Sequence, residues 1–301
     1  MRGYASQGYA ASLAEFGALR PLPASGSWIQ ERAIPHSEYY DARALYPLFA
    51  CNSWTHLPND LDELADSGLV SLVVVTDPFG DYTEDLLHQC FPDLMRPFKQ
   101  HYIIDYDQPF LNQISKHHRY YARKSLEMVQ VEHYSEPLRL LDEWVALYDV
   151  LVRRHEITGV QAFSRSAFER QLALPNMTVF RAVYEEKTIG IHLWIQDHDA
   201  VYSHLTAFSE TGYKLNASYA LYWYAIEHFA NQVTLLDLGS GAGLTDDAND
   251  SLSWFKRGWS NSEKYVYLCG RIFNHGQYAS LTGVLSTRTT DYFPLYRAGS
   301  R

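Results

Sequence analysis

A glycine-rich segment after a short apolar run is the part of this sequence that most directly indicates chemistry. Residues 236–243 read L-D-L-G-S-G-A-G, which gives the pattern D-x-G-x-G-x-G from Asp237 onward. The apolar residues 233–236 that precede it are typical of a strand. Glycines let a backbone approach a ligand closely. The segment therefore has the form of a nucleotide-binding loop.

This loop is similar to the S-adenosylmethionine loop of class I methyltransferases, but its context differs. In that fold, most of a doubly wound sheet follows the glycine loop. Here Gly243 lies near the end of a 301-residue chain, and the acidic segment 244–250 stands where a helix should begin. No second strand ends in an acidic ribose ligand about 20 residues later. We therefore interpret the glycines as a tight connection beside a functional cleft.

Two metal-binding patterns begin in the sequence and are not completed. Residues 155–156 start H-E-x-x-H, but position 159 is glycine. The segment 246–250 is calcium-like, yet the glycine and the closing glutamate of an EF-hand are missing. We expect Asp250 to cap a helix instead, and we expect no metal site.

The composition and the net charge limit the classes of protein to which this chain can belong. Hydrophobic residues make up 47% of the chain and aromatic residues 15%, which is enough for a packed core. The net charge of −10 argues against non-specific binding of nucleic acid, although a local basic patch could still bind one phosphate-bearing ligand. The three cysteines are widely spaced and form no C-x-x-C, so we expect free thiols. We find no signal peptide and no membrane span, and we expect a cytoplasmic protein.

The elements that must position these residues alternate along the chain. In the first half, the periodicity predicts helices over 38–49, 82–91 and 109–128 and strands over 69–75, 100–106 and 129–133. In the second half it predicts helices over 138–155, 165–172, 215–230 and 251–257 and strands over 178–184, 188–196, 200–208, 233–238 and 264–273.

The order of the second-half elements resembles that of the GNAT acyltransferase superfamily. Within it, residues 204–229, 235–241 and 254–259 resemble the Fem-type branch, which comprises the peptidoglycan-bridge aminoacyltransferases and their relatives. The most specific element is the F-K-x-G-aromatic box from Phe255 to Trp259. The helix K-H-H-R-Y-Y-A-R-K at 116–124 also resembles an R-x-x-x-R-K helix of that branch.

The resemblance implies an α+β protein with a tandem GNAT-like, or acyl-CoA N-acyltransferase, fold. Mixed, mainly antiparallel sheets would be flanked by helices, and the first half would be degenerate. We expect a loosely ordered lead-in over 1–26, a degenerate half over 27–134 that includes the linking helix 109–128, and a C-terminal GNAT domain over 135–301. The resemblance also implies that the strands ending at Phe208 and Asp237 splay apart around the acyl donor.

The resemblance further implies a donor-binding helix start near residue 215. The helix dipole and free N–H groups there would bind phosphates; the expected binding residues are Lys214, Asn216, Ala217, Ser218 and Tyr222. GNAT enzymes that use coenzyme A usually have a glycine-rich turn at this point, and residues 213–218 lack it. The alternative is an ordinary helix start with a capping asparagine.

Arg119 and Arg123 share one face of the predicted linking helix with Lys116, at helical spacing. They would contact a phosphate-rich donor or acceptor; the alternative is a solvated basic face.

Two side chains are expected to take part in the reaction. Lys256 would stabilise the oxyanion that develops on the donor carbonyl, together with a backbone N–H of residues 205–208. His204 would act as the general base, with His192 on the adjacent strand and on the same face. The alternatives are a surface lysine and a hydrogen-bonded core histidine.

The function we expect is N-acyl transfer from an activated donor to the amine of a small molecule or a peptide. The donor is an acyl-CoA or acyl carrier protein thioester or, as an alternative, an aminoacyl-tRNA, and we expect no tightly bound cofactor. A third alternative is a non-catalytic binding protein on a GNAT scaffold. The acceptor and the oligomeric state stay open.

Overall fold

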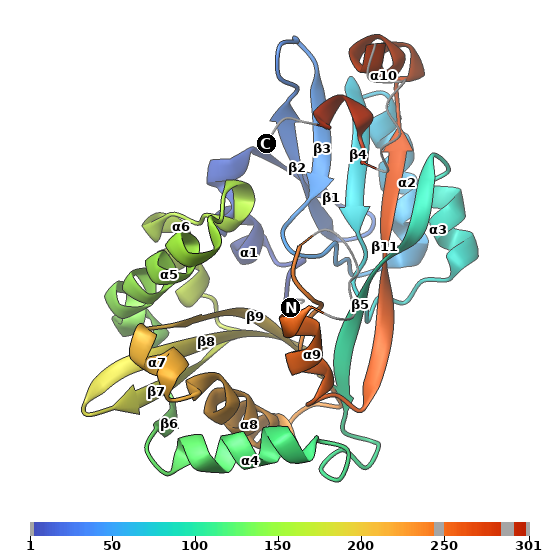
Figure 1. Ribbon diagram of the computed structural model, residues 1–301. Coiled ribbons are helices and arrows are strands. Elements are labelled where there is room, and N and C mark those ends of the chain that lie inside the picture. Colours follow the sequence, from blue (N-terminus) through green and yellow to red (C-terminus); the bar gives the residue numbers. More distant parts are fainter. Residues whose placement is uncertain (1–2, 244–249, 284–291, 299–301) are drawn as a thin grey trace. The chain divides into compact units, whose positions relative to one another are not determined.

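A computed structural model describes residues 3–243, 250–283 and 292–298, and it divides into two compact units (Figure 1). Unit 1 contains residues 99–265, and unit 2 contains residues 2–98 and 266–301. Each unit combines a mixed, mainly antiparallel sheet with helices. The predicted α+β class is therefore confirmed.

The sheet of unit 1 places its strands in the order β5-β10-β9-β8-β7-β6. Neighbouring strands pair antiparallel except β9 and β10, which pair parallel. The bounds are β5 Leu94–Asp105, β6 Gln130–His133, β7 Met177–Tyr184, β8 Lys187–Asp197, β9 Ala200–Phe208 and β10 Leu235–Asp237.

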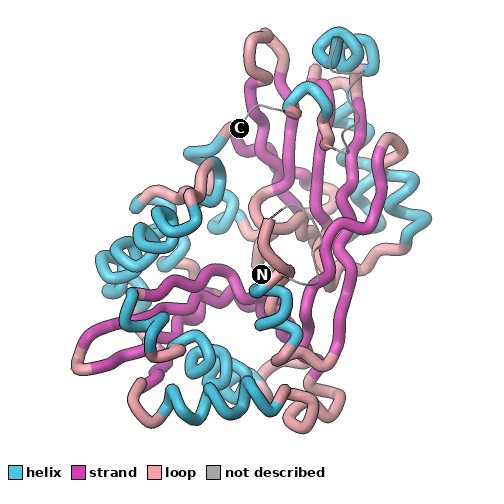
Figure 2. Tube along the Cα trace, in the orientation of Figure 1, coloured by secondary structure: helices cyan, strands magenta, loops and turns pink. Residues whose placement is uncertain are grey.

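Helices cover both faces of the unit 1 sheet (Figure 2). On one face α8 packs against β7 and β8, and α4 packs on α8; on the other face α5 packs against β8 and β9, and α6 on α5. Because α8 is covered on two sides, it is apolar nearly all round. The bounds are α4 Lys116–Leu126, α5 Leu141–His155, α6 Arg165–Leu172, α7 Glu210–Lys214, α8 Ala217–Phe229 and α9 Ser251–Arg257.

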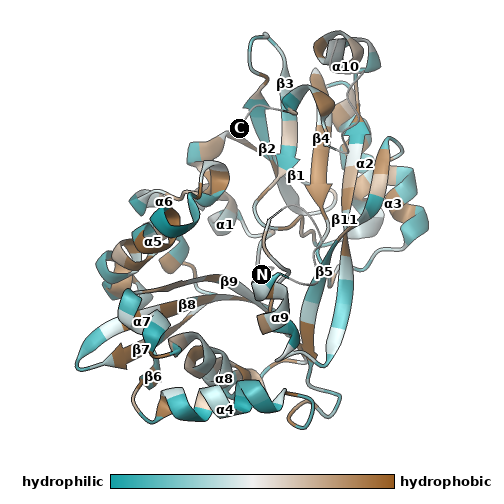
Figure 3. Ribbon diagram, in the orientation of Figure 1, coloured by the Kyte–Doolittle hydropathy of each residue, from teal (hydrophilic) through white to brown (hydrophobic). Residues whose placement is uncertain are grey.

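The sheet of unit 2 has the strand order β1-β2-β3-β4-β11. Here β3 and β4 pair parallel, and the other pairs are antiparallel. The apolar strand β4 packs its side chains against the leucines of α2 and α3, and its brown colour in Figure 3 shows this composition. The bounds are α1 Gln7–Ser12, β1 Ala18–Leu22, β2 Ser27–Ala33, β3 Tyr40–Ala44, α2 Leu57–Ala65, β4 Leu69–Val75, α3 Glu84–Cys90, β11 Ser262–Ile272 and α10 His275–Thr282.

The strands of the two units share one pattern. In unit 2 the neighbours β2-β3-β4-β11 pair antiparallel, parallel and antiparallel in turn. In unit 1 the neighbours β8-β9-β10-β5 pair in the same sequence. The fourth strand of each unit comes from the other half of the chain. Helices connect the parallel strands in both cases, as a parallel connection requires. This repeated pattern is the structural form of the tandem GNAT-like fold.

Most predicted elements are confirmed, and the structure differs from several expectations. Residues 38–49 contain the strand β3 instead of a helix, because pairing with β2 and β4 outweighs the helical preference of this segment. The described part of the lead-in, residues 3–26, contains α1 and β1 instead of loosely ordered chain, and its Tyr9 and Leu13 are fully buried. The linking helix begins at Lys116, and the compact units divide the chain elsewhere than at the expected boundary of 134 and 135.

Candidate active site

The parallel strands β9 and β10 separate after three residue pairs. Leu235, Leu236 and Asp237 lie opposite Ala200, Val201 and Tyr202, and β9 then continues to Phe208 along β8. On the side that β10 has left, the backbone groups of residues 203–208 have no partner in β10. The splay expected from the resemblance is confirmed.

A β-bulge lies where the strands separate. Leu193 of β8 pairs with Leu205, while the next residue, Trp194, pairs with Ser203, so His204 is the extra residue. A bulge bends its strand and changes which side chains share a face. Ser203 and Thr206 therefore both reach Tyr222 on α8, although strict alternation would place them on opposite faces.

Asp237 ends β10 at this point and is buried. Its carboxylate lies 2.9 Å from Nδ1 of His101 on β5, and it accepts a hydrogen bond from the backbone N–H of Gly239 at 2.7 Å. Both side chains are less than 10% exposed. The aspartate therefore fixes the start of the glycine loop and joins it to the neighbouring strand.

Lys256 extends from α9 to the same loop. Its Nζ donates to the carbonyl of Ser240 at 2.8 Å. Burial lowers the pKa of Lys256 to about 8, Asp237 and Asp250 oppose this change, and Lys99 adds to it. A Cβ at Gly239 would lie 2.9 Å from Nζ, and the backbone there has a φ of +80°. The left-handed backbone therefore favours glycine at the start of the loop, and the absence of a side chain there leaves room for the lysine.

The second glycine serves the same arrangement. A Cβ on Gly241 would overlap the side chains of Asp250 and Ser253. Asp250 caps α9 by accepting from the backbone N–H of Leu252 at 2.8 Å, as predicted. The buried Lys99 donates to the carbonyls of Gly241 and Ala242. The glycine loop therefore connects β10 to α9 and is held by two lysines.

A buried polar network lines the bulge on the α8 face. Nε2 of His192 lies 2.8 Å from Ser203 Oγ, and Tyr222 hydrogen-bonds with Ser203 and Thr206. Nδ1 of His192 is buried and has no hydrogen-bond partner within the described residues. Burial, then the charge of Lys256, lowers the pKa of His192 well below its usual value. The imidazole is therefore neutral and lies within the electrostatic reach of the lysine.

Comparison with known families agrees with this geometry. Residues 112–248 match the family model of the acetyltransferase (GNAT) domain. The chain therefore resembles a GNAT domain over these residues. The match to this family includes the strands from β6 to β10, whereas Lys256, α9 and the strand β5 lie outside the matched range.

Solved structures extend the likeness of fold beyond the GNAT domain. FemX aligns with a TM-score of 0.68 at 11% identity, over 92% of this chain and 94% of that chain. The C-terminal domain of a putative lysylphosphatidylglycerol synthetase from Agrobacterium fabrum gives 0.61 at 13%, over 90% and 89%. L-PGS from Bacillus licheniformis gives 0.60 at 13%, over 91% and 94%. The Fem-type, GNAT-like fold is therefore confirmed, while no curated protein sequence matches the chain.

The predicted donor-binding residues of the GNAT domain lie in different surroundings. Lys214 is exposed at the end of α7, and Asn216 adopts a left-handed conformation before α8. Ser218 is half-buried, but Ala217 and Tyr222 are buried in the core. Tyr222 thus contacts the bulge of β9 from inside the domain.

The helix α4 carries the two predicted arginines. Arg119 is half-buried and Arg123 is exposed, and neither has a carboxylate within 4.0 Å among the residues described. The opposite face of α4 carries His118, which is buried. Nε2 of His118 donates to the carbonyl of Phe255 at 2.8 Å, and Nδ1 accepts from Ser115 Oγ at 2.6 Å. Histidine 118 therefore attaches α4 to the α9 segment that bears Lys256.

The structure separates the predicted base His204 from His192. His204 lies at the bulge, and its Nε2 is 3.3 Å from Gln171 Oε1 on α6. His192 instead contacts Tyr222 on α8, with ring centroids 4.8 Å apart. The expectation that these two histidines share a face is wrong, because the bulge turns His204 toward α6.

Sequence reasoning missed the residues that hold the loop in place. Lys99 and His101 stand two apart on β5, so they point to the same side of the strand. That spacing was the available signal, but the partners of these residues lie more than 130 residues later in the chain. His118 was also missed, although it lies inside the matched helix motif.

Among the residues described, no group of three histidine, cysteine or acidic side chains could hold a metal ion. The calcium-like segment falls largely on residues 244–249, which lie outside the described residues. No described helix has both the length and the apolar composition needed to cross a membrane.

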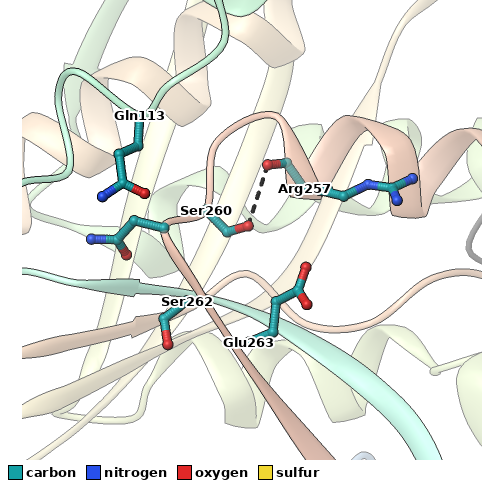
Figure 4. Close-up of a pocket in the computed structure, with 6 residues that line it drawn as sticks. Gln113, Arg257, Ser260, Ser262 and Glu263 are labelled. Carbon is teal, nitrogen blue, oxygen red and sulfur yellow. Dashed lines mark hydrogen bonds between the residues drawn. The ribbon is translucent and has the colours of Figure 1, made fainter.

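A separate polar pocket of about 280 Å³ opens at the end of α9 (Figure 4). It contains none of the predicted site residues. Its lining consists of Gln113, Arg257, Ser260, Asn261, Ser262 and Glu263.

Proposed function

We propose that the protein is an N-acyltransferase that moves an acyl or aminoacyl group from a thioester donor to an amine. The observation that carries the proposal is the position of Lys256, next to Asp237 at the point where β10 leaves β9. An unpaired strand edge offers backbone N–H donors, and a nearby ammonium offers positive charge. Both are what a developing oxyanion needs.

The reaction forms one bond and breaks another. The amine nitrogen attacks the thioester carbon, and the negative charge moves to the carbonyl oxygen, where Lys256 and an N–H of residues 205–208 stabilise it. The carbon–sulfur bond then breaks, the amide forms, and the thiolate takes up the proton that the amine gives up. With a pKa of about 8, Lys256 is mostly protonated at neutral pH.

His204 remains our proposed base for the amine proton, but it is a weak one. Burial lowers its pKa to about 3, so the imidazole is neutral yet takes up a proton poorly. The acyl transfer therefore needs an acceptor amine that is already unprotonated when it binds.

The donor phosphates are proposed to bind at the start of α8, near Lys214, Asn216 and Ser218. Aminoacyl-tRNA is the second candidate donor. The observation that favours it is Asn216, whose side chain stands where coenzyme A-dependent GNAT enzymes usually have glycine. The acceptor is proposed to be the amine of a small molecule or a peptide.

A calorimetric titration with coenzyme A tests the donor. For a thioester donor we expect micromolar binding in the wild type and loss of binding in Lys214→Glu. An absence of coenzyme A binding to the folded wild type would favour aminoacyl-tRNA as the donor.

Turnover with an acyl-CoA and a panel of amines tests catalysis. We expect Lys256→Ala to lower kcat/KM by about 10² to 10³, the usual cost of losing an oxyanion donor. Lys187→Ala, an exposed lysine at the start of β8, serves as the matched control. Equal kcat/KM in the wild type and Lys256→Ala would refute the role of the lysine, and ligand binding without turnover would favour the non-catalytic alternative.

A further inference from the structure

One face of the unit 2 sheet carries a group of arginines that the proposed acyl transfer does not use. In the pairing of β2 with β3, Gln30 lies opposite Arg43 and Arg32 lies opposite Asp41. Directly paired residues, and residues two apart on one strand, share a face of the sheet. Arg297 of the C-terminal segment joins this face by hydrogen-bonding Asp41 at 2.9 Å.

Asp41 balances part of the positive charge on this face. Its carboxylate is fully buried and accepts from Nε of Arg32 at 3.1 Å, from Arg297, and from the hydroxyl of Tyr296 at 3.1 Å. One negative charge is thus shared between two guanidinium groups. Buried charge is stable only when it is compensated.

Arg43 has a neutral partner. Its Nε and Nη2 donate to Oε1 of Gln30 at 3.0 and 2.6 Å, and Nε2 of Gln30 donates to the carbonyl of Leu13. No carboxylate of a described residue lies within 4.0 Å of the Arg43 guanidinium. Burial lowers the pKa of Arg43 to about 10, and the charges of Arg32 and Arg297 contribute to this shift.

The three guanidinium groups share one pattern of hydrogen bonds, in which Nη1 takes no part. Nε and Nη2 of Arg32, Arg43 and Arg297 make the polar contacts of these side chains: Arg32 with Asp41, Arg43 with Gln30, and Arg297 with Asp41 and the carbonyl of Ala33. Nη1 of each makes no hydrogen bond to a described residue, and none of these atoms is buried without a partner. Each Nη1 therefore reaches solvent.

We propose that Arg32, Arg43 and Arg297 form a binding site for a phosphate group. Guanidinium groups bind phosphate oxygens through paired N–H donors, and a bound dianion would supply the charge that Asp41 does not. The phosphate is free or is part of a nucleotide, and the site is independent of the acyl donor at α8.

Calorimetry with the full chain tests this site. Inorganic phosphate and ADP are titrated separately into the wild type, Arg43→Gln and Arg20→Gln. Arg20 is the matched control, because it is paired opposite Ile29 on the other face of the sheet and forms an ion pair with Glu31. We expect saturable binding of phosphate in the wild type, at least tenfold weaker binding in Arg43→Gln, and unchanged binding in Arg20→Gln.

Comparing the affinities for phosphate and ADP distinguishes a free phosphate from a nucleotide as the ligand. Tighter binding of ADP than of phosphate supports a nucleotide ligand, and equal binding supports a free phosphate. Circular dichroism checks that each variant is folded. If Arg43→Gln does not fold, Arg43→Lys replaces it, and we expect several-fold weaker binding because lysine lacks the planar fork. No saturable binding in the wild type, or equal binding in the Arg43 variants, would overturn the proposal.

Discussion

At the scale of single residues, the protonation of Lys256 determines the expected pH dependence of the reaction. The ammonium form stabilises an oxyanion, and this form is lost as the pH rises through about 8. With an acceptor amine that stays unprotonated across the range, we expect kcat/KM to fall above pH 8. Lys256→Arg, whose guanidinium stays charged, should show no such fall. An identical alkaline limb in both proteins would show that another group causes it.

His118 gives a second prediction, which concerns stability. Burial lowers its pKa to about 4. The unfolded chain therefore takes up a proton at a higher pH than the folded protein, and stability is lost as the pH falls from about 6.5 toward 4. Between pH 7 and 4.5 this loss amounts to about 2 kcal/mol in the wild type.

The measurement is urea unfolding of the wild type and of His118→Gln at both pH values. The glutamine retains a donor for the carbonyl of Phe255 but does not titrate. The advantage of the wild type should shrink by about 2 kcal/mol on acidification. A difference that stays constant with pH would mean that His118 does not carry this titration.

The sequence identified some of these residues and not others for a physical reason. Asp250 caps α9 and Lys256 lies within it, so the position of each in this helix follows from the local sequence. Lys99 and His101 act on loop atoms from a distant strand, and only the pairing of β5 with β10 brings them there. No local pattern encodes such a contact.

At the scale of elements, the bulge in β9 can be removed without changing the strand pairs. Deleting His204 would leave Ser203 opposite Trp194 and Leu205 opposite Leu193, which is a regular ladder. We expect a folded protein with a straighter β9 and less acyl transfer than in His204→Ala, which lacks the proposed base but retains the bulge, because the bulge bends the strand where the donor carbonyl is proposed to bind. Equal transfer by the two variants would show that the bulge itself has no role. Thermal melting and turnover test this, and full activity of the folded deletion variant would contradict it.

The elements that the sequence predicted best are those with strong local signals. Strand β9 and helices α6 and α9 have the predicted bounds, since each combines a clear period with a cap or a turn. Strand β3 lies within a segment that was predicted to be helical. Its conformation is determined by partners on both sides, which the local sequence does not show.

At the scale of the whole molecule, the reactivity of the three cysteine thiols reports how tightly unit 2 is packed. Cys51, Cys90 and Cys269 form no disulfide bond and are buried. Burial raises the pKa of Cys90 to about 11 and that of Cys269 to about 12, so thiolate is scarce at neutral pH. We expect Ellman's reagent to react slowly with the native protein and to detect all three thiols in denaturant. Rapid reaction of any thiol in the native state would show that this core opens easily.

The strand that completes unit 2 comes from the end of the chain, and this has a consequence for biosynthesis. Strands β1 to β4 leave the ribosome early, but the partner of β4 on one side is β11 at residues 262–272. Until that segment emerges, the apolar sequence L-V-S-L-V-V-V presents an open edge. In the sequence, unit 1 lies between the two segments of unit 2, so it can be completed first. Of the two units, the one whose translation begins first is therefore the last to close, and its nascent form is the one that needs protection from aggregation.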